Sequence, residues 1–323
     1  MSEKRWIIGV DGGGTKTEAV LAAMDGDGQA TIVAHGISGP SNMRLAGRKQ
    51  ALASLDEAIA AATGGPTGKI VADVAVLALA GSTFADVQEE IRNWATRRGI
   101  ARNIEITSDA APVMAAGTPE GWGVALVVGT GSVAIGVGSD GRWITRGGWG
   151  HWYGDKGSGY DLGRQALAAI SEAEDGMGPE TVLSNAIREY FQLENPRLII
   201  QELYRRGNVR AQVAAAAPVV LAAASEGDIV AIRIVENAIG ELMRLVTAVT
   251  CDLDLHDPYP LALAGGIVCR NKAYRDRLVT GLEATTPPPG PVTPVPQPVT
   301  GCITMGQALL EGHPPPVTWP PQK

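Results

Sequence analysis

The sequence of this protein is poor in cysteine, in aromatic residues and in clustered positive charge. Its three cysteines, Cys251, Cys269 and Cys302, lie far apart in the chain. Neither a disulfide framework nor a C-x-x-C site is expected from them, and buried free thiols are predicted. The net charge is −7 and no block of Lys and Arg occurs, which argues against nucleic-acid binding through a basic patch.

Long apolar runs are also missing. No run reaches the roughly 18 residues of a transmembrane helix, and the first residues, MSEKRW, lack the apolar core of a signal peptide. We therefore expect a cytoplasmic protein with no membrane partner. The chain has 323 residues, of which 45% are apolar and 19% charged, as in a globular protein long enough for two domains.

Two glycine-rich loops between apolar strands organise the sequence. Residues 6–10 form one apolar segment and residues 18–24 another, with the run DGGGTK between them; residues 123–128 precede the run GTGS in the same way. Glycines let backbone N–H groups approach an anion closely. Each loop alone is also compatible with a plain hairpin turn, but the repeat predicts two related halves that hold the phosphates of a nucleotide. The candidate phosphate-binding residues are Gly12, Gly13, Gly14, Thr15, Lys16, Thr130, Gly131 and Ser132.

Strand and helix signals alternate along the first part of the chain, and helices dominate the second part. The predicted strands are three within 5–37, with a turn at 25–28, and then 74–80, 104–107 and 259–263. The predicted helices are 45–62, 86–98, 110–116, 158–171, 179–191, 196–206, 209–224, 228–253, one from about 271, and 304–311. The seven prolines of 287–298 predict a loop with an edge strand at most, and the tail is rich in proline.

This alternation predicts an α/β fold in which helices cover a sheet. A domain boundary is expected at 117–119, which divides the chain into domains 1–118 and 119–323. The C-terminal helix is a candidate to pack back on the first domain.

Polar residues at strand ends are the candidates for chemistry. Asp11 could hold Mg²⁺ directly or through water. Asp109 follows a strand and precedes a helix, so it either caps that helix or accepts a proton from an attacking hydroxyl. Asp155 could likewise be a cap or bind a ligand, and Asn42 is either a turn residue or a hydrogen-bonding group for a polar ligand.

An aromatic cluster stands out in a chain with only 5% aromatic residues. Trp149, Trp152 and Tyr153 lie among glycines in the segment after the second loop. They either pack in a core or form an apolar face for a sugar ring. His151, between them, is interpreted as a structural histidine.

Together these residues resemble the N-acetylglucosamine kinase and BadF/BadG/BcrA/BcrD ATPase family of the actin/Hsp70/sugar-kinase superfamily. The matching segments follow the order of the family and reach from end to end of the chain, apart from the proline-rich tail. They are GVDGGGTKTE (9–18), GPSN (39–42), TSDA (107–110), VVGTGS (127–132), GGWGHWYGDKGSGY (147–160) and ALAGGI (262–267).

The resemblance implies two ribonuclease-H-like domains around a central nucleotide cleft that takes ATP, Mg²⁺ and a small sugar. In such a kinase Asp109 would be the base that deprotonates the sugar 6-hydroxyl, and Asp11 would be the Mg²⁺-associated carboxylate. Gly265 and Gly266 would approach the adenosine. The residues implied to hold the sugar are Asn42, Asp109, Gly148, Trp149 and Asp155. The preferred substrate is N-acetylglucosamine or glucosamine, and a homodimer is left open.

One position departs from the family, which commonly has Gly-Asp-Glu-Gly-Ser where this chain has Lys156 after Asp155. A lysine that pointed at the sugar would disfavour the free amine of glucosamine, whereas a lysine facing solvent would have no effect. Other readings are a kinase of N-acetylmuramic acid, an ATPase that activates a partner enzyme, and a nucleotide-dependent chaperone or filament protein. The absence of a close cysteine pair argues against an activator with an iron–sulfur cluster.

Overall fold

The computed structural model describes residues 4–25, 28–64, 71–82, 84–118 and 120–315. The chain forms two compact units: residues 1–122 with 297–323, and residues 123–296. The boundary between residues 122 and 123 lies after the predicted one between 118 and 119, and the C-terminal helix α13 (Val299–Leu310) belongs to the first unit, on which it was a candidate to pack. The tip of the turn predicted at 25–28, the last residue of the predicted boundary and the end of the proline-rich tail lie outside the described residues.

The first unit is built on a five-stranded sheet in the order β3-β2-β1-β4-β5. Its strands are β1 (Arg5–Gly12), β2 (Thr17–Met24), β3 (Ala30–Ser38), β4 (Ala72–Leu79) and β5 (Ala101–Thr107). β1, β4 and β5 are parallel to one another, whereas β1, β2 and β3 form an antiparallel meander. The carboxyl ends of β1, β4 and β5 therefore meet at one edge of the sheet.

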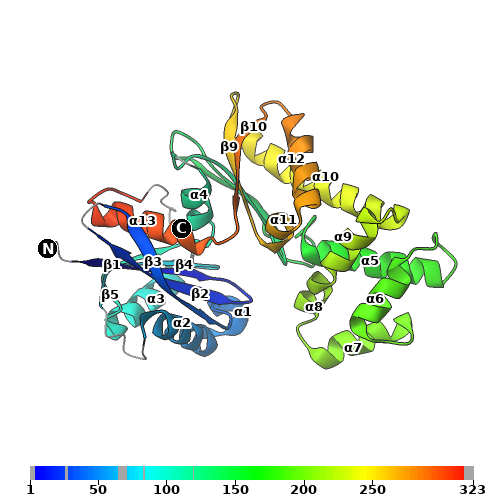
Figure 1. The fold of residues 1–323 in the computed structure, drawn as a ribbon, viewed down its shortest axis with the longest axis horizontal. Coiled ribbons are helices and arrows are strands. Elements are labelled where there is room, and N and C mark those ends of the chain that lie inside the picture. The colour runs from blue at the N-terminus through cyan, green and yellow to red at the C-terminus, as the bar shows by residue number, and fades with distance from the viewer. Residues whose placement is uncertain (1–3, 26–27, 65–70, 83, 119, 316–323) are drawn as a thin grey trace. The chain divides into compact units, whose positions relative to one another are not determined.

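Helices cover both faces of this sheet (Figure 1). On one face, α13 packs Val299 and Ile303 against Ile7 and Val20. The other face packs against α2 (Arg48–Thr63) and α3 (Ala85–Arg98) in a core rich in alanine and leucine. α4 (Ala111–Gly117) follows β5 and packs against α13.

The predicted helix 45–62 is two helices, α1 (Met43–Ala46) and α2. Gly47 separates them with a φ of 80°, a conformation that other residues rarely adopt and that no helix can continue through. The apolar spacing of Leu52, Leu55 and Ile59 therefore locates α2, but it does not reveal the break before it.

The second unit repeats the arrangement of the first, with a sheet in the order β10-β9-β6-β7-β8. Its strands are β6 (Gly123–Val128), β7 (Ser132–Val137), β8 (Trp143–Gly147), β9 (Tyr259–Ala264) and β10 (Pro289–Val295). β6, β9 and β10 are parallel, and β7 and β8 continue β6 as an antiparallel meander. The predicted related halves are thus present as matching sheets. β10 is the predicted edge strand, where proline costs few ladder hydrogen bonds.

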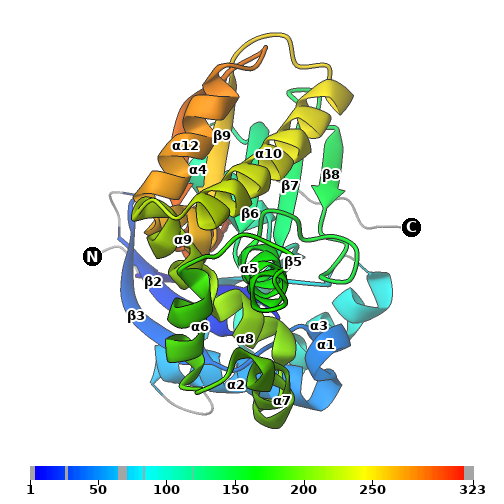
Figure 2. The same ribbon diagram turned by 90° about the vertical axis from the view of Figure 1, so that its right-hand side faces the viewer.

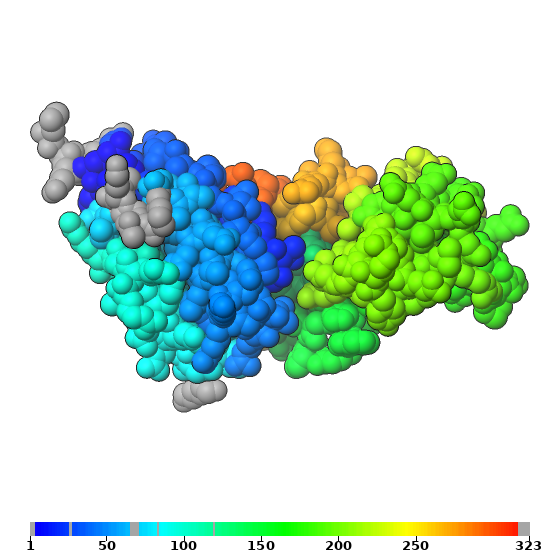
Figure 3. Space-filling view, turned by 90° about the horizontal axis from the view of Figure 1, so that it is seen from below, coloured from blue at the N-terminus to red at the C-terminus, as the bar shows by residue number. Residues whose placement is uncertain are grey.

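The long helix α10 (Ile229–Asp252) crosses β6 and β7 on one face of this sheet, with α12 (Lys272–Glu283) beside it (Figure 2). Most of the remaining helices form a region of the second unit shown in green in Figure 3. They are α5 (Gly159–Glu174), α6 (Leu183–Phe191), η1 (Pro196–Leu198), α7 (Ile199–Arg206), α8 (Val209–Ala215) and α9 (Ala217–Ser225). The predicted helix 209–224 is therefore two helices, and the short helix α11 (Gly266–Arg270) was not predicted.

Two further expectations can be compared with the structure. The prediction of buried thiols holds for Cys302 but is wrong for Cys251, which is exposed on α10. In the described part of the chain no single helix is long and apolar enough to cross a membrane, although one bent pair, Val209–Ser225 with Ile229–Asp252, passes that test of length and composition.

Candidate active site

The carboxyl edge of the first sheet collects the polar residues that the sequence pointed to. Asp11 and Gly12 end β1, and Asp109 follows β5. The amide of Ala80, just after β4, donates to the carbonyl of Gly12 at 2.8 Å, which ties the ends of β1 and β4 together. Asp11 and Asp109 are close enough for the charge of Asp109 to affect the pKa of Asp11.

The first glycine loop is a hairpin whose tip is open to solvent. The amide of Gly13 donates to the carbonyl of Lys16 at 2.9 Å, while Gly14, Thr15 and Lys16 are exposed. The carbonyl of Gly13 accepts hydrogen bonds from the amides of Ser41 and Asn42, at 3.1 and 3.3 Å. The GPSN segment is therefore attached directly to this loop.

Asn42 has a structural role as well. Its side-chain oxygen accepts the amides of Arg44 and Leu45, at 3.0 and 3.3 Å, and so caps the short helix α1. The oxygen is thus engaged, whereas the NH₂ group of the same side chain is a donor suited to a ligand hydroxyl.

Asp109 is not the helix cap that a lone Asp in this position suggests. α4 begins after Ala110 without a side-chain cap, and the hydroxyl of Ser108 accepts the amide of Ala110 at 3.2 Å. The carboxylate of Asp109 accepts a hydrogen bond from the same Ser108 hydroxyl, at 3.2 Å, and the residue keeps an exposed surface. The local backbone therefore makes little use of this carboxylate.

The surroundings of both carboxyl groups disfavour their ionised forms. Removal from bulk water raises the pKa of Asp109, and the hydrogen bond from Ser108 offsets part of that rise. Removal from water, together with the nearby charge of Asp109, raises the pKa of Asp11 from 3.8 to about 7, against the opposing effect of Lys16. Two carboxyl groups that repel each other in this way suit a site completed by a cation.

These residues fit Mg²⁺ bound together with a nucleotide. Among the described residues no group of three or more His, Cys, Asp or Glu side chains could form a metal cage. Mg²⁺ rarely needs one, since nucleotide-dependent enzymes hold it with one or two carboxylates plus phosphate oxygens and water. Asp11 and its neighbour Asp109 supply such carboxylates at the strand edge.

The second glycine loop is held by the start of α5. The carbonyl of Gly129 accepts the amide of Gly159 at 2.9 Å, and that of Thr130 accepts the amide of Tyr160 at 3.3 Å. Ser132 is buried, and both of its donors are used inside the unit: its amide points to Asp155 at 3.3 Å and its hydroxyl to the carbonyl of Lys156 at 2.7 Å. In this structure Ser132 therefore organises Asp155 and presents no donor to a phosphate.

Asp155 forms a buried ion pair that the sequence did not reveal. Its side chain is only 3% exposed, and its Oδ2 accepts a hydrogen bond from Nη2 of Arg210 on α8 at 2.9 Å. The helix that follows is capped by Ser158, not by Asp155. Arg210 lies 55 positions away in a helix with no recognisable motif, so only the folded chain brings it to the site.

Gly131 is the point where this ion pair meets the loop. A Cβ atom added to Gly131 would lie 2.7 Å from Oδ1 of Asp155 and 2.8 Å from Nη2 of Arg210. Such distances are too short for any side chain. The loop, the carboxylate and the guanidinium are therefore packed as one cluster.

The aromatic cluster does not belong to a core. Trp149, Trp152 and Tyr153 are 70%, 85% and 75% exposed. His151 stacks obliquely on Trp152 and meets the edge of Tyr160, with ring centroids 5.0 and 5.1 Å apart, as expected of a structural histidine. Of the two interpretations left open, an exposed apolar face agrees with the structure.

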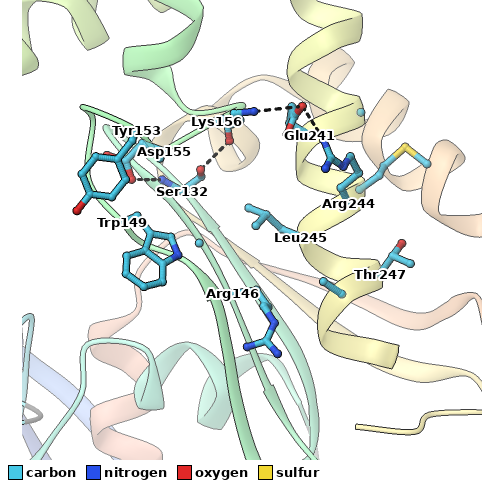
Figure 4. Close-up of a pocket in the computed structure, with 15 residues that line it drawn as sticks. Ser132, Arg146, Trp149, Tyr153, Asp155, Lys156, Glu241, Arg244, Leu245 and Thr247 are labelled. Atoms are coloured by element: carbon cyan, nitrogen blue, oxygen red, sulfur yellow. Dashed lines mark hydrogen bonds and ion pairs between the residues drawn. The ribbon is translucent and has the colours of Figure 1, made fainter. Parts of the chain in front are cut away.

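A pocket of about 700 Å³ lies between this aromatic segment and α10 (Figure 4). Trp149 and Tyr153 stand on one side of it, and Leu245 and Thr247 on the other. The Nζ of Lys156 lies 3.7 Å from Glu241 of α10 and is directed away from Asp155. Lys156 is thus directed at α10, and its charge faces Glu241.

The remaining predicted residues lie just after strands β8 and β9 of the second sheet. Gly148 follows β8, and its amide donates to the carbonyl of Ser132 at 3.0 Å. Gly265 follows β9 beside the backbone of Val128 and Gly129, and Gly266 begins α11. Within the second unit the structure therefore brings together the second loop, Asp155, the Gly148–Trp149 segment and Gly265.

Comparison with known proteins places these features in a family. Residues 8–299 match the model of the BadF/BadG/BcrA/BcrD ATPase family. An N-acetylmuramic acid/N-acetylglucosamine kinase from Clostridium acetobutylicum is 31% identical over 268 residues, which is 82% of this chain and 86% of the relative. An N-acetyl-D-glucosamine kinase from Dictyostelium discoideum is 30% identical over 288 residues, or 85% and 89% of the two chains.

Solved structures agree with the fold. A Chromobacterium violaceum protein thought to be an N-acetylglucosamine kinase is 26% identical, with a TM-score of 0.67 over 93% of this chain and 98% of its own. A ROK family glucokinase from Streptomyces griseus shares the fold at 15% identity, with a TM-score of 0.56 over 94% and 98%. The predicted fold class, two α/β domains of the actin-like kind, is confirmed.

Proposed function

Because the chain belongs to the BadF/BadG/BcrA/BcrD ATPase family, as its motifs predicted, we propose that it transfers the γ-phosphate of ATP to the 6-hydroxyl of an amino sugar, with N-acetylglucosamine as the preferred substrate. The curated relatives that cover more than four fifths of this chain are kinases of such sugars, which supports an ATP-dependent sugar kinase.

The observation that carries the proposal is the state of Asp109. Its carboxylate stands at the end of a parallel strand, is little used by the local backbone, and has its pKa raised by removal from bulk water. A raised pKa makes a carboxylate a stronger base, which is what deprotonation of a sugar hydroxyl requires. Asp109 would accept that proton as the hydroxyl oxygen attacks the γ-phosphorus in line with the departing ADP.

The other residues would bind and orient. The amides of Gly14 and Thr15 at the exposed tip of the first loop, and those of the half-buried Thr130 and Gly131 in the second, would receive phosphate oxygens, with Gly265 and Gly266 near the adenosine. Asp11 would hold Mg²⁺, which when bound neutralises charge on the phosphates. Catalysis then depends on orientation and electrostatics, and no covalent enzyme intermediate is required.

Sugar recognition would use hydrogen bonds and one apolar face. The NH₂ group of Asn42 and the carboxylate of Asp155 would bind hydroxyls, together with the backbone of Gly148. The exposed ring of Trp149 offers a flat surface for the sugar ring. Because Lys156 is paired with Glu241, its charge does not select between an acetylated and a free amino group.

The test is an assay of ADP release with ATP, Mg²⁺ and a panel of N-acetylglucosamine, glucosamine and N-acetylmuramic acid. We expect release that depends on a sugar and a product phosphorylated on its 6-hydroxyl by NMR. Asp109→Asn should lower kcat by about 10² to 10⁴-fold and leave sugar binding intact. Asp86→Asn, an exposed change on α3, is the control. ATP hydrolysis without sugar dependence, or an active Asp109→Asn enzyme, would refute the proposal.

A further inference from the structure

Arg210 of α8 forms an ion pair with the carboxylate of Asp155. One oxygen of Asp155 accepts Nη2 of Arg210 at 2.9 Å, and the other faces the amide of Ser132 at 3.3 Å. The backbone of Asp155 has a φ of 53°, in the left-handed region, which Asp adopts more often than most residues other than glycine. The Arg210 pair is the one ion pair of the Asp155 side chain among the described residues.

The position of Arg210 is itself fixed by the packing of α8. This helix packs against α5, whose first residues hold the second glycine loop through Gly129 and Thr130. The side chain of Arg210 is 32% exposed, but its Nε is buried and makes no hydrogen bond within the described part of the protein. The guanidinium is therefore engaged with Asp155 through one nitrogen and keeps a further donor at the same place.

We propose that Arg210 is a positioning residue for sugar binding: it holds the buried carboxylate of Asp155 at the wall of the pocket, so that its remaining lone pairs face the sugar hydroxyls. An ionised carboxylate has about four acceptor sites, and Arg210 and Ser132 occupy two of them. The inference rests on the proposed function, because it assigns Asp155 to the sugar. It adds that α8, a helix outside every family motif quoted above, determines the affinity for the sugar.

Substitutions of Arg210 separate this role from general stability. Arg210→Gln removes the charge and should raise the KM for N-acetylglucosamine at least tenfold, with the KM for ATP and kcat each changed less than threefold. Arg210→Lys keeps the charge, on a single nitrogen, and should restore part of the lost affinity. Arg206→Gln is the matched control, because Arg206 belongs to the preceding helix and its ion pair is with Glu202, away from the site.

A double substitution tests whether the effect of Arg210 on sugar binding passes through Asp155. If Arg210 acts through Asp155, adding Arg210→Gln to Asp155→Asn should raise the KM little beyond Asp155→Asn alone. The inference is wrong if the two substitutions raise the sugar KM by factors that multiply. It is also wrong if the Arg210→Gln enzyme has an unchanged sugar KM and an unchanged melting temperature. If Arg210→Gln does not fold, Arg210→Asn and Arg210→Lys replace it. A sugar KM equal to that of the wild type in both variants would also overturn the inference. A wild-type enzyme that phosphorylates no sugar in the panel refutes the proposed function itself, which is a distinct result.

Discussion

The substitution Asp11→Asn should stabilise the protein in the absence of ligand, increasingly so as the pH rises. The fold raises the pKa of Asp11 from 3.8 to about 7, because the carboxyl group is shielded from water and faces the charge of Asp109. Between these two values the folded state binds a proton that the unfolded state releases. Asp11 therefore destabilises the folded state least below pH 4, and this destabilisation grows as the pH rises to about 7.

The size of the effect follows from the same two values. A rise from 3.8 to about 7 corresponds to at most about 4 kcal/mol between the protonated and ionised forms. Asp11 is only half-buried, and solvent screening reduces this to about 2 kcal/mol. For a domain of this size, that corresponds to a rise in Tm of about 4 to 8 °C at pH 8.

The assay compares the Tm of the wild type and Asp11→Asn without nucleotide or Mg²⁺ from pH 4 to pH 8. We expect nearly equal values at pH 4 and the full difference by pH 8. Glu57→Gln, which removes an exposed charge from α2 in the same unit, controls for a general change of net charge. A difference in Tm that does not grow with pH would refute the electrostatic reasoning about this site.

Two further predictions concern the second unit. Gly131→Ala should raise the sugar KM at least tenfold, because its Cβ would lie 2.7 Å from the carboxylate of Asp155. The control is Gly129→Ala, which should behave like the wild type in the same kinetic assay because its Cβ meets nothing within 4 Å. Equal effects of the two alanines would contradict the packing argument. Lys156→Ala should change the ratio of kcat/KM for N-acetylglucosamine and glucosamine less than twofold, because Lys156 faces Glu241; a larger shift would place its charge at the sugar.

Local sequence determined the parts of the fold that depend on neighbouring residues. The apolar segments around residues 6–10 and 123–128 became the central strands β1 and β6, because continuous apolar runs are stable only when buried on both faces. Their repetition predicted two matching sheets, and the position of Asp109 after a strand placed it at the carboxyl edge. The errors at Gly47 and at Ala216, the residue between α8 and α9, are local as well, since apolar spacing continues across a break in a helix.

Tertiary structure decided which polar groups are engaged and which are open. Sequence alone did not show that Asn42 caps a helix, that Ser132 uses both its donors on the Asp155–Lys156 segment, or that Lys156 turns to α10. Nor did it indicate Arg210, because a contact across 55 positions depends on how α8 packs against α5. Sequence patterns record the periodicity of burial along the chain, whereas the direction of a polar side chain is set by distant partners that only packing supplies.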